Sequence, residues 1–172
     1  MLKSKRPWKE IHGQIQARIQ EQIQTLTANA HDPSQLRKRY MNIFIAAAWP
    51  HLKEHGVSWI GFYQADLDWP HTTCMLLAAR EPKPACSPIG LHGACGQSFT
   101  SAKPLLVRDV AQLGSDYIAC DPRDKSELVV PCFDSAGKVW GVIDLDSFDL
   151  DSFDDVDAGN IENLLQVARL SL

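Results

Sequence analysis

Apolar residues recur every three or four positions between residues 9 and 28, in a background of Gln, Arg and Glu. The positions are Ile11, Ile15, Ile19, Ile23 and Leu26. Steps of four, four, four and three place these side chains on one face of a helix. The first 31 residues are therefore predicted to form an amphipathic N-terminal helix.

A second helix is predicted to begin near Asp32, whose carboxylate suits an N-cap, with Pro33 in the first turn. Apolar residues continue at helical spacing towards Pro50 or His55. Gly56 is predicted to end the helix, because glycine readily adopts the left-handed conformation found after helix C-termini.

Beyond Gly56 the apolar residues gather in short runs that are typical of strands. The predicted strands are residues 57–63, 73–79, 105–107, 127–133 and 138–145. The polar turn from Asp134 to Gly137 joins the last two as a hairpin. A final helix is predicted over residues 153–170, with Ser152 or Asp151 as its cap.

Helices at both ends and antiparallel strands between them predict an α+β fold in one domain spanning residues 1–172. The terminal helices are expected to cover one face of the sheet, and the long connections to cover part of the other. The segment 81–102, rich in proline and glycine, is expected to be a functional loop.

Composition narrows the class of protein. The 172 residues are 45% hydrophobic and carry a formal net charge of −4, without a long basic run. This balance excludes a disordered chain and argues against nucleic acid or an anionic membrane as partner. The longest apolar run is 43–49, much shorter than the roughly 20 residues of a membrane span. No secretory signal is recognised, and a cytoplasmic location is expected.

The five cysteines fall into two groups. Cys74 and Cys132 lie within apolar strands and are predicted to be buried. Cys86, Cys95 and Cys120 lie in polar or flexible segments, where thiol–disulfide chemistry and simple burial are about equally plausible. A zinc site that adds His92 to these three is disfavoured, because no two cysteines stand two to four residues apart. No metal is expected.

Carboxylates are concentrated at the ends of two neighbouring strands. Asp144 and Asp146 are two positions apart and share one face, and Glu127 begins the adjacent strand opposite them. Gathered carboxylates repel each other, so at least one pKa should be raised. Such a group suits a proton donor or a site for a substrate ammonium. The alternative is a solvated acidic rim, which is preferred for residues 149–157 together with helix capping.

Two aromatic residues, Trp59 and Tyr63, stand four apart on one strand and therefore share a face. Core packing is the default interpretation for such residues. The alternative is the wall of a pocket for a small apolar group.

The candidate residues lie within six short motifs that follow one another along the chain. The motifs are Ser58-Trp-Ile-Gly-Phe-Tyr63, Pro84-Ala-Cys86, Gly93-Ala-Cys95-Gly96, Tyr117-Ile-Ala-Cys-Asp121, Ser126-Glu-Leu-Val-Val-Pro131 and Gly137-Lys-Val-Trp-Gly-Val-Ile-Asp-Leu-Asp-Ser147. In this combination the chain resembles the free methionine-(R)-sulfoxide reductases, which are single-domain GAF proteins. The resemblance covers residues 33–170 and implies a GAF-like fold.

The resemblance also implies roles for individual residues. It implies that Cys120 is the catalytic thiol, Cys86 the resolving thiol and Cys95 a third thiol that takes part in disulfide exchange. The residues that it places around the substrate are Glu127, Asp144, Asp146, Trp59, Tyr63, Asp121 and Ser126. It further implies a homodimer without cofactor, which repairs oxidative damage to free methionine and is recycled by thioredoxin or another dithiol.

The chemistry of the residues is consistent with that role. A Cys120 thiolate would attack the sulfoxide sulfur while Glu127 or Asp146 protonates the departing oxygen. The resulting sulfenic acid would condense with Cys86. Asp121 should oppose formation of the thiolate, whereas Arg123 and Lys125 should favour it, and the sequence does not decide which effect is larger.

Three other functions remain open from the sequence. The first is a GAF module that binds a ligand or senses redox state without turnover, although the lack of an output domain after Leu172 favours an enzyme. The second is a degenerate reductase limited to one turnover. The third is a structural protein that docks a partner through its Gln-rich first helix.

Overall fold

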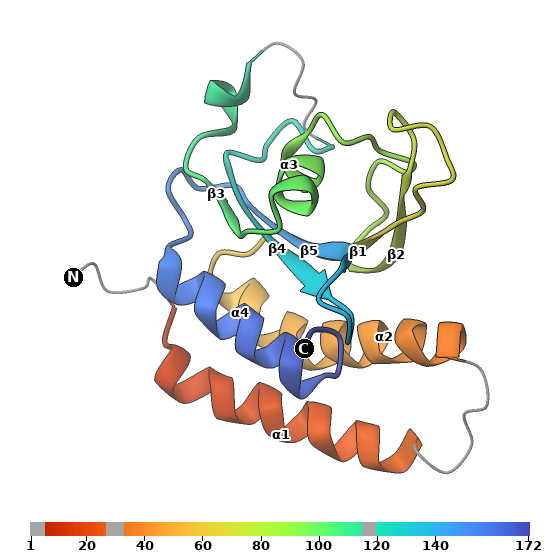
Figure 1. Cartoon of the computed structure of the whole chain (residues 1–172). Helices are drawn as coiled ribbons and strands as arrows, with labels where there is room; N and C mark the ends of the chain where they lie inside the picture. The colour runs from red at the N-terminus through yellow and green to blue at the C-terminus, as the bar shows by residue number, and fades with distance from the viewer. Residues whose placement is uncertain (1–5, 27–32, 115–119) are drawn as a thin grey trace.

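The computed structural model describes residues 6–26, 33–114 and 120–172. Within them, five strands form one sheet in the order β2-β1-β5-β4-β3, with every neighbouring pair antiparallel. The strands are β1 (Trp59–Ala65), β2 (Met75–Glu81), β3 (Leu105–Val107), β4 (Ser126–Phe133) and β5 (Val139–Ser147). The predicted α+β fold with a central antiparallel sheet is confirmed (Figure 1).

Three helices cover one face of this sheet: α1 (Trp8–Leu26), α2 (Pro33–Leu52) and α4 (Asp155–Val167). In Figure 1, α2 and α4 lie against the sheet and α1 forms an outer layer across them. A short 3-10 turn, Lys53–His55, extends α2 to Gly56, which has a φ of 87°. The predicted end of this helix is confirmed, whereas its predicted cap, Asp32, lies outside the described residues. None of these helices combines the length and apolar character that crossing a membrane requires.

The apolar face of α1 is buried in the core of the protein. Ile15 and Ile19 are fully buried, and Ile11 and Ile23 are at most 5% exposed, in the core shared with α2 and α4. This apolar side is therefore not available to a partner, and docking through the Gln-rich helix stays a hypothesis. Its outward face is polar.

Gly13 offers a simple test of α1. It lies exposed inside the helix, and a Cβ built on it meets no atom within 4 Å. Gly13→Ala is expected to raise the free energy of unfolding by about 0.5–1 kcal/mol, because alanine loses less backbone entropy on entering a helix. Urea unfolding measures the change. A midpoint below that of the wild type would contradict it.

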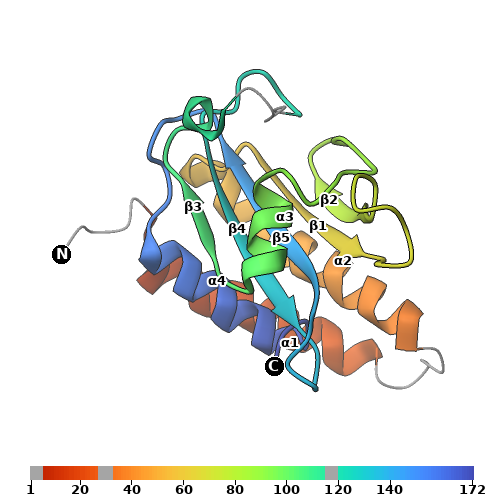
Figure 2. The same ribbon diagram turned by 45° about the horizontal axis from the view of Figure 1, so that its top comes forward.

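The other face of the sheet carries α3 (Ala94–Ser101) and the connections around it (Figure 2). The prediction that residues 81–102 form a loop throughout is wrong, because the last part of this segment is helical. The helix is short and begins Ala-Cys-Gly, without an apolar repeat that would reveal it. Gly96 brings it close to the preceding turn: a Cβ there would lie 2.1 Å from the Leu91 Cα.

The hairpin turn between β4 and β5 agrees with its prediction from the sequence, whereas the cap of α4 does not. The Asp134–Gly137 hairpin turn is confirmed, with the Gly137 N–H donating to the Asp134 carbonyl over 2.9 Å. The cap of α4 is Asp154, not Ser152 or Asp151. Its carboxylate accepts from the N–H groups of Val156 and Asp157, and the Asp157 carboxylate accepts from the Asp154 N–H.

Candidate functional site

A cavity of about 240 Å³ opens on the face of the sheet that carries α3. Its floor is formed by β1, β4 and β5, and its walls by the N-terminus of α3 and the segments around Cys86 and Cys120. Seven of the predicted site residues line it: Tyr63, Cys86, Cys95, Cys120, Glu127, Asp144 and Asp146. Segments far apart in the sequence therefore meet at one place.

Three carboxylates form the acidic floor of the cavity. Glu127 and Asp146 are cross-strand partners on β4 and β5, and Asp144 is two residues from Asp146 on the same face. Oxygens of the three carboxylates lie within 4.8 Å of one another, and the residues are only 3%, 7% and 8% exposed in chain order. The predicted convergence of the two strand ends is confirmed.

Burial and mutual repulsion determine how these groups ionise. Removal from water, followed by the neighbouring carboxylates, raises the pKa of both Asp144 and Asp146 well above the usual range for aspartate. This agrees with the prediction of at least one raised pKa. The cluster would be stabilised by any positive group that reached it, either an ammonium or a metal ion.

The three cysteines are free thiols arranged around this floor. Cys95, at the start of α3, is buried and donates a hydrogen bond of 3.3 Å to the Asp144 Oδ2. Cys86 and Cys120 are exposed and lie close together, so that the side chain and the backbone of Cys86 both affect the pKa of the Cys120 thiol. Cys74 and Cys132 are buried, as predicted.

The structure shows how the charges around Cys120 are paired, which the sequence left open. The Asp121 carboxylate is paired with the guanidinium of Arg123 at 2.7 Å and with the Lys83 ammonium. These cations hold the pKa of Asp121 well below its usual range and offset its effect on the neighbouring thiol. Partial removal from water is instead the main cause that raises the pKa of Cys120 to about 12. Burial therefore favours the protonated thiol of Cys120 over its thiolate.

The structure agrees with both interpretations of the aromatic pair, core packing and the wall of a pocket. Trp59 and Tyr63 are 4% and 2% exposed, with ring centroids 6.2 Å apart, and belong to the core on this face of the sheet. Tyr63 also lines the cavity, and Trp59 lines a smaller cavity beside it. Gly61 between them gives room to the indole, because a Cβ there would lie 2.2 Å from the Trp59 ring.

Two further predicted residues lie elsewhere. Asp121 lines the smaller cavity together with Trp59, and its carboxylate is paired with Lys83 and Arg123. Ser126 is not brought to either cavity, because strand alternation turns it away from the face that carries Glu127. Its hydroxyl donates to the Asp149 carbonyl at 2.6 Å and accepts from the Ser152 N–H at 3.2 Å. The prediction that Ser126 lies at the substrate site is therefore corrected, because this residue has a structural role.

The sequence analysis missed an acidic residue of the site, Asp124. Asp124 lines both cavities and is 6% exposed, and burial raises its pKa. Its Oδ1 accepts a hydrogen bond of 3.2 Å from the Ser58 hydroxyl. In the sequence it is one of several polar residues in the turn after Cys120, and only its proximity to that motif pointed to it. Residues 117–119 of the same motif lie outside the described part of the chain.

The comparisons with known proteins agree with this geometry. Residues 20–170 match the GAF domain family. The chain is 35% identical to the free methionine-R-sulfoxide reductase of Saccharomyces cerevisiae over 67% of this chain and 63% of that protein. It is 34% identical to GAF domain-containing protein A of Dictyostelium discoideum, over 63% of this chain and 66% of that protein. The matched region thus spans slightly less than two thirds of these curated relatives.

A solved structure extends the similarity to nearly the whole chain. The free methionine-R-sulfoxide reductase of Neisseria meningitidis, solved in complex with its substrate, superposes with a TM-score of 0.72 at 28% identity. The superposition covers 94% of this chain and 85% of that one. The resemblance recognised in the motifs is confirmed, and the chain belongs to the GAF domain family, in which its relatives include the free methionine-R-sulfoxide reductases.

Proposed function

We propose that this protein reduces free L-methionine-(R)-sulfoxide to methionine, with Cys120 as the nucleophile. The observation that carries the proposal is the meeting of three thiols and three buried carboxylates around one small cavity. The reductases of S. cerevisiae and N. meningitidis, to which the chain is similar, support the choice of substrate.

The acidic floor accounts for a free amino acid as substrate. The ammonium of free methionine sulfoxide would neutralise the repulsion among Glu127, Asp144 and Asp146. A methionine sulfoxide within a polypeptide has an amide in place of this ammonium and would leave the carboxylates uncompensated. Tyr63 provides an apolar wall for the side chain.

The cysteines account for the reduction. The Cys120 thiolate attacks the sulfoxide sulfur and forms an S–S bond while the sulfoxide oxygen is protonated. The hydroxyl then passes to the Cys120 sulfur as the S–O and S–S bonds to the substrate sulfur break, so the products are methionine and a sulfenic acid on Cys120. The proton comes from Glu127 or Asp146, and the raised pKa of Asp146 suits a proton donor. The ammonium of the bound substrate also favours the thiolate of Cys120 over its protonated form.

The thiol next to Cys120 then closes the cycle. The Cys86 sulfur displaces the sulfenic oxygen as water and forms a disulfide, which thioredoxin or another dithiol reduces. The exposure of both thiols supports access by such a reductant. We place this chemistry in the cytoplasm, in a homodimer without cofactor, with Cys95 exchanging into the disulfide.

The test is methionine release from free L-methionine-(R)-sulfoxide with dithiothreitol. Wild type is expected to turn over, and Cys120→Ser to fall to background, a loss of roughly 10³-fold or more because serine is a far weaker nucleophile without an adjacent base. Cys74→Ala, whose thiol is buried outside the cavity, is the matched control and should retain activity. The (S) epimer and N-acetylmethionine sulfoxide should react poorly. A folded wild type without turnover would refute the proposal.

A module that binds the same ligand without turnover is the second candidate. The raised pKa of Cys120 favours it, since a protonated thiol is a poor nucleophile. The chain is also 31% identical to a protein of Burkholderia vietnamiensis described as a putative GAF sensor protein. Saturable binding of methionine sulfoxide by a wild type that releases no methionine would support this candidate.

A further inference from the structure

The segment that carries Cys86 is fixed on its inner side by two aromatic residues of β1. Trp59 donates from its Nε1 to the Lys83 carbonyl at 2.8 Å, and the Tyr63 hydroxyl donates to the Cys86 carbonyl at 2.8 Å. These bonds hold the backbone of the segment on either side of Ala85. Neither bond connects this segment to the separate turn that carries Cys120.

An ion pair makes that connection. The Lys83 ammonium, three residues before Cys86, pairs with the carboxylate of Asp121, the residue after Cys120. The Asp121 carboxylate is itself fixed by Arg123, which donates from Nε at 3.0 Å, from a terminal nitrogen at 2.7 Å and from its backbone N–H at 3.0 Å. Arg123 stacks over the Phe148 ring at 4.5 Å.

The position of this pair relative to the thiols suggests its purpose. Both thiols lie in irregular segments, and a disulfide tolerates only a narrow range of separations between the two Cβ atoms. We propose that Lys83 and Asp121 form a clasp, the charged pair that joins the two segments, which positions Cys86 for closure of the disulfide with Cys120. This inference rests on the proposed function and assigns both residues to its second step.

In that step the Cys86 sulfur bonds to the Cys120 sulfur and the S–O bond of the sulfenic acid breaks. The proton of the Cys86 thiol leaves with that oxygen as water, so no external oxidant or reductant is consumed. The clasp contributes proximity and orientation to this reaction. It does not touch the substrate cavity, since neither Lys83 nor Asp121 lines it.

The exposure of the Lys83 and Asp121 side chains determines how strongly loss of the clasp should affect closure of the disulfide. The Asp121 side chain is 9% exposed, whereas that of Lys83 is 49% exposed. A pair of this kind is screened by water and salt, so its loss should change closure by about two- to fivefold rather than abolish it.

The experiment separates the two steps in a single turnover without dithiol. Methionine formed reports the first step, and loss of free thiols reports the second. Lys83→Met is expected to form methionine at close to the wild-type rate, because Arg123 still neutralises the Asp121 carboxylate beside Cys120. It is expected to close the disulfide about two- to fivefold more slowly. More of the sulfenic acid should then be trapped by dimedone. Lys83→Arg should restore closure, and Arg108→Met, which removes an exposed pair with Asp151, should leave both steps unchanged.

Salt provides a second readout. About 0.5 M sodium chloride should slow closure in the wild type and have little effect on Lys83→Met, because only the wild type has a clasp to screen. A purely structural contribution of the lysine stem would show neither the rescue by arginine nor this difference. Closure at the wild-type rate in Lys83→Met would overturn the proposal.

An equilibrium measurement tests the clasp even if the proposed reduction fails. In a glutathione buffer, one glutathione disulfide converts the dithiol protein into the Cys86–Cys120 disulfide and two glutathione molecules. The equilibrium constant should be about two- to fivefold smaller in Lys83→Met than in the wild type and Lys83→Arg. Equal constants would refute the clasp. Absence of methionine formation in the wild type would refute the proposed function alone.

Discussion

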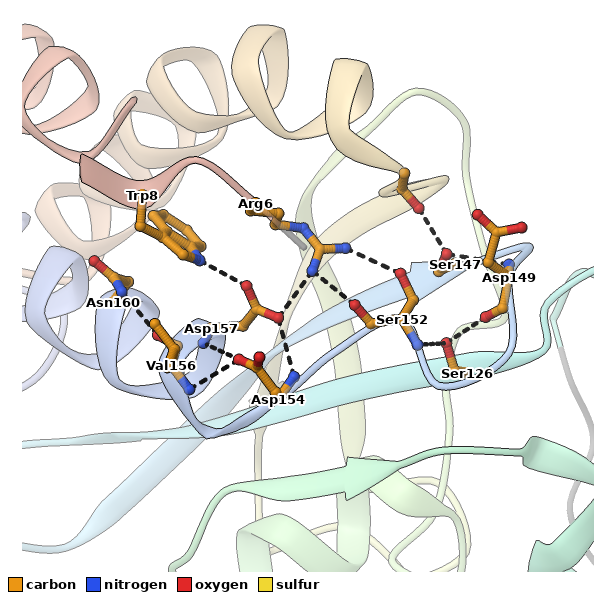
Figure 3. A network of polar contacts seen from close by, with 11 residues as sticks. Arg6, Trp8, Ser126, Ser147, Asp149, Ser152, Asp154, Val156, Asp157 and Asn160 are labelled. Atoms are coloured by element: carbon orange, nitrogen blue, oxygen red, sulfur yellow. Dashed lines mark hydrogen bonds and ion pairs between the residues drawn. The ribbon is translucent and has the colours of Figure 1, made fainter. Parts of the chain in front are cut away.

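Replacing Arg6 with alanine is expected to lower the free energy of unfolding by about 3–5 kcal/mol. The guanidinium lies between the N-terminal segment and α4, where it pairs with the Asp157 carboxylate at 2.9 Å (Figure 3). The two side chains are only 1% and 2% exposed. Removing the cation leaves a carboxylate buried without its charge partner, and such a group costs far more than an exposed one.

Other bonds of Arg6 add to this loss. Its terminal nitrogens donate to the Ser152 carbonyl at 3.0 Å and to the Ser152 hydroxyl at 3.2 Å, and its guanidinium stacks on the Phe153 ring at 4.4 Å. Asp157 would keep the bond from the Trp8 Nε1 at 2.6 Å, which limits the damage. The network thus ties the start of α1 to the start of α4 (Figure 3).

Urea unfolding followed by tryptophan fluorescence measures the effect. The matched control is Arg108→Ala, which removes an ion pair with Asp151 whose side chains are 60% and 54% exposed. That change should cost less than about 1 kcal/mol, because exposed pairs contribute little. Similar losses for the two variants would show that burial does not determine the contribution of Arg6.

Local patterns in the sequence were sufficient for most of the fold. The helical spacing of the isoleucines in α1 and the turn at Gly137 each depend on neighbours along the chain, and both are confirmed. Asp157 shows the limit of such patterns. It stands in an acidic stretch that resembles a solvated rim, yet Arg6 pairs with it across 151 residues. No local pattern predicts a partner so distant.

A tandem repeat in the sequence, Asp-Leu-Asp-Ser-Phe at 144–148 and again at 149–153, shows the same limit of local patterns. In the first copy Asp144 and Asp146 continue β5 and face the cavity, whereas in the second Asp149 and Asp151 are exposed before α4 begins. Identical residues acquire different environments because only the first copy is paired with β1 and β4. The strand register predicted the acidic floor, but the residues that meet it from distant segments, such as Asp124, required the tertiary structure.

Replacing Asp146 with asparagine is expected to stabilise the free protein and weaken substrate binding. Burial and the charges of Asp144 and Glu127 raise the pKa of Asp146, so its ionised form opposes folding. Asparagine keeps the shape and removes the charge. The free energy of unfolding at pH 8 should rise by about 1–3 kcal/mol, the typical cost of a polar group that is buried without full compensation.

The dependence on pH has a definite sign. A carboxyl whose folded pKa lies above its unfolded pKa stabilises the protein while it is protonated, and this contribution is lost as the pH rises through the folded value. The advantage of Asp146→Asn should therefore be largest at pH 8 and shrink as the pH approaches about 4, where the unfolded carboxyl also binds a proton. Asp68→Asn, a change at an exposed turn, should show no such trend. An advantage that grows towards acid would contradict this assignment.

The same change should raise the KM for free methionine-(R)-sulfoxide at least about tenfold, because the substrate ammonium loses one of its buried counter-charges. Stability and binding thus respond in opposite directions, since the repulsion among the carboxylates that lowers the stability of the free protein is what the substrate ammonium relieves. A structural role for Asp146 would lower stability and activity together. Steady-state kinetics and urea unfolding on one preparation of Asp146→Asn distinguish the two, and a less stable variant with unchanged KM would exclude an acidic substrate site.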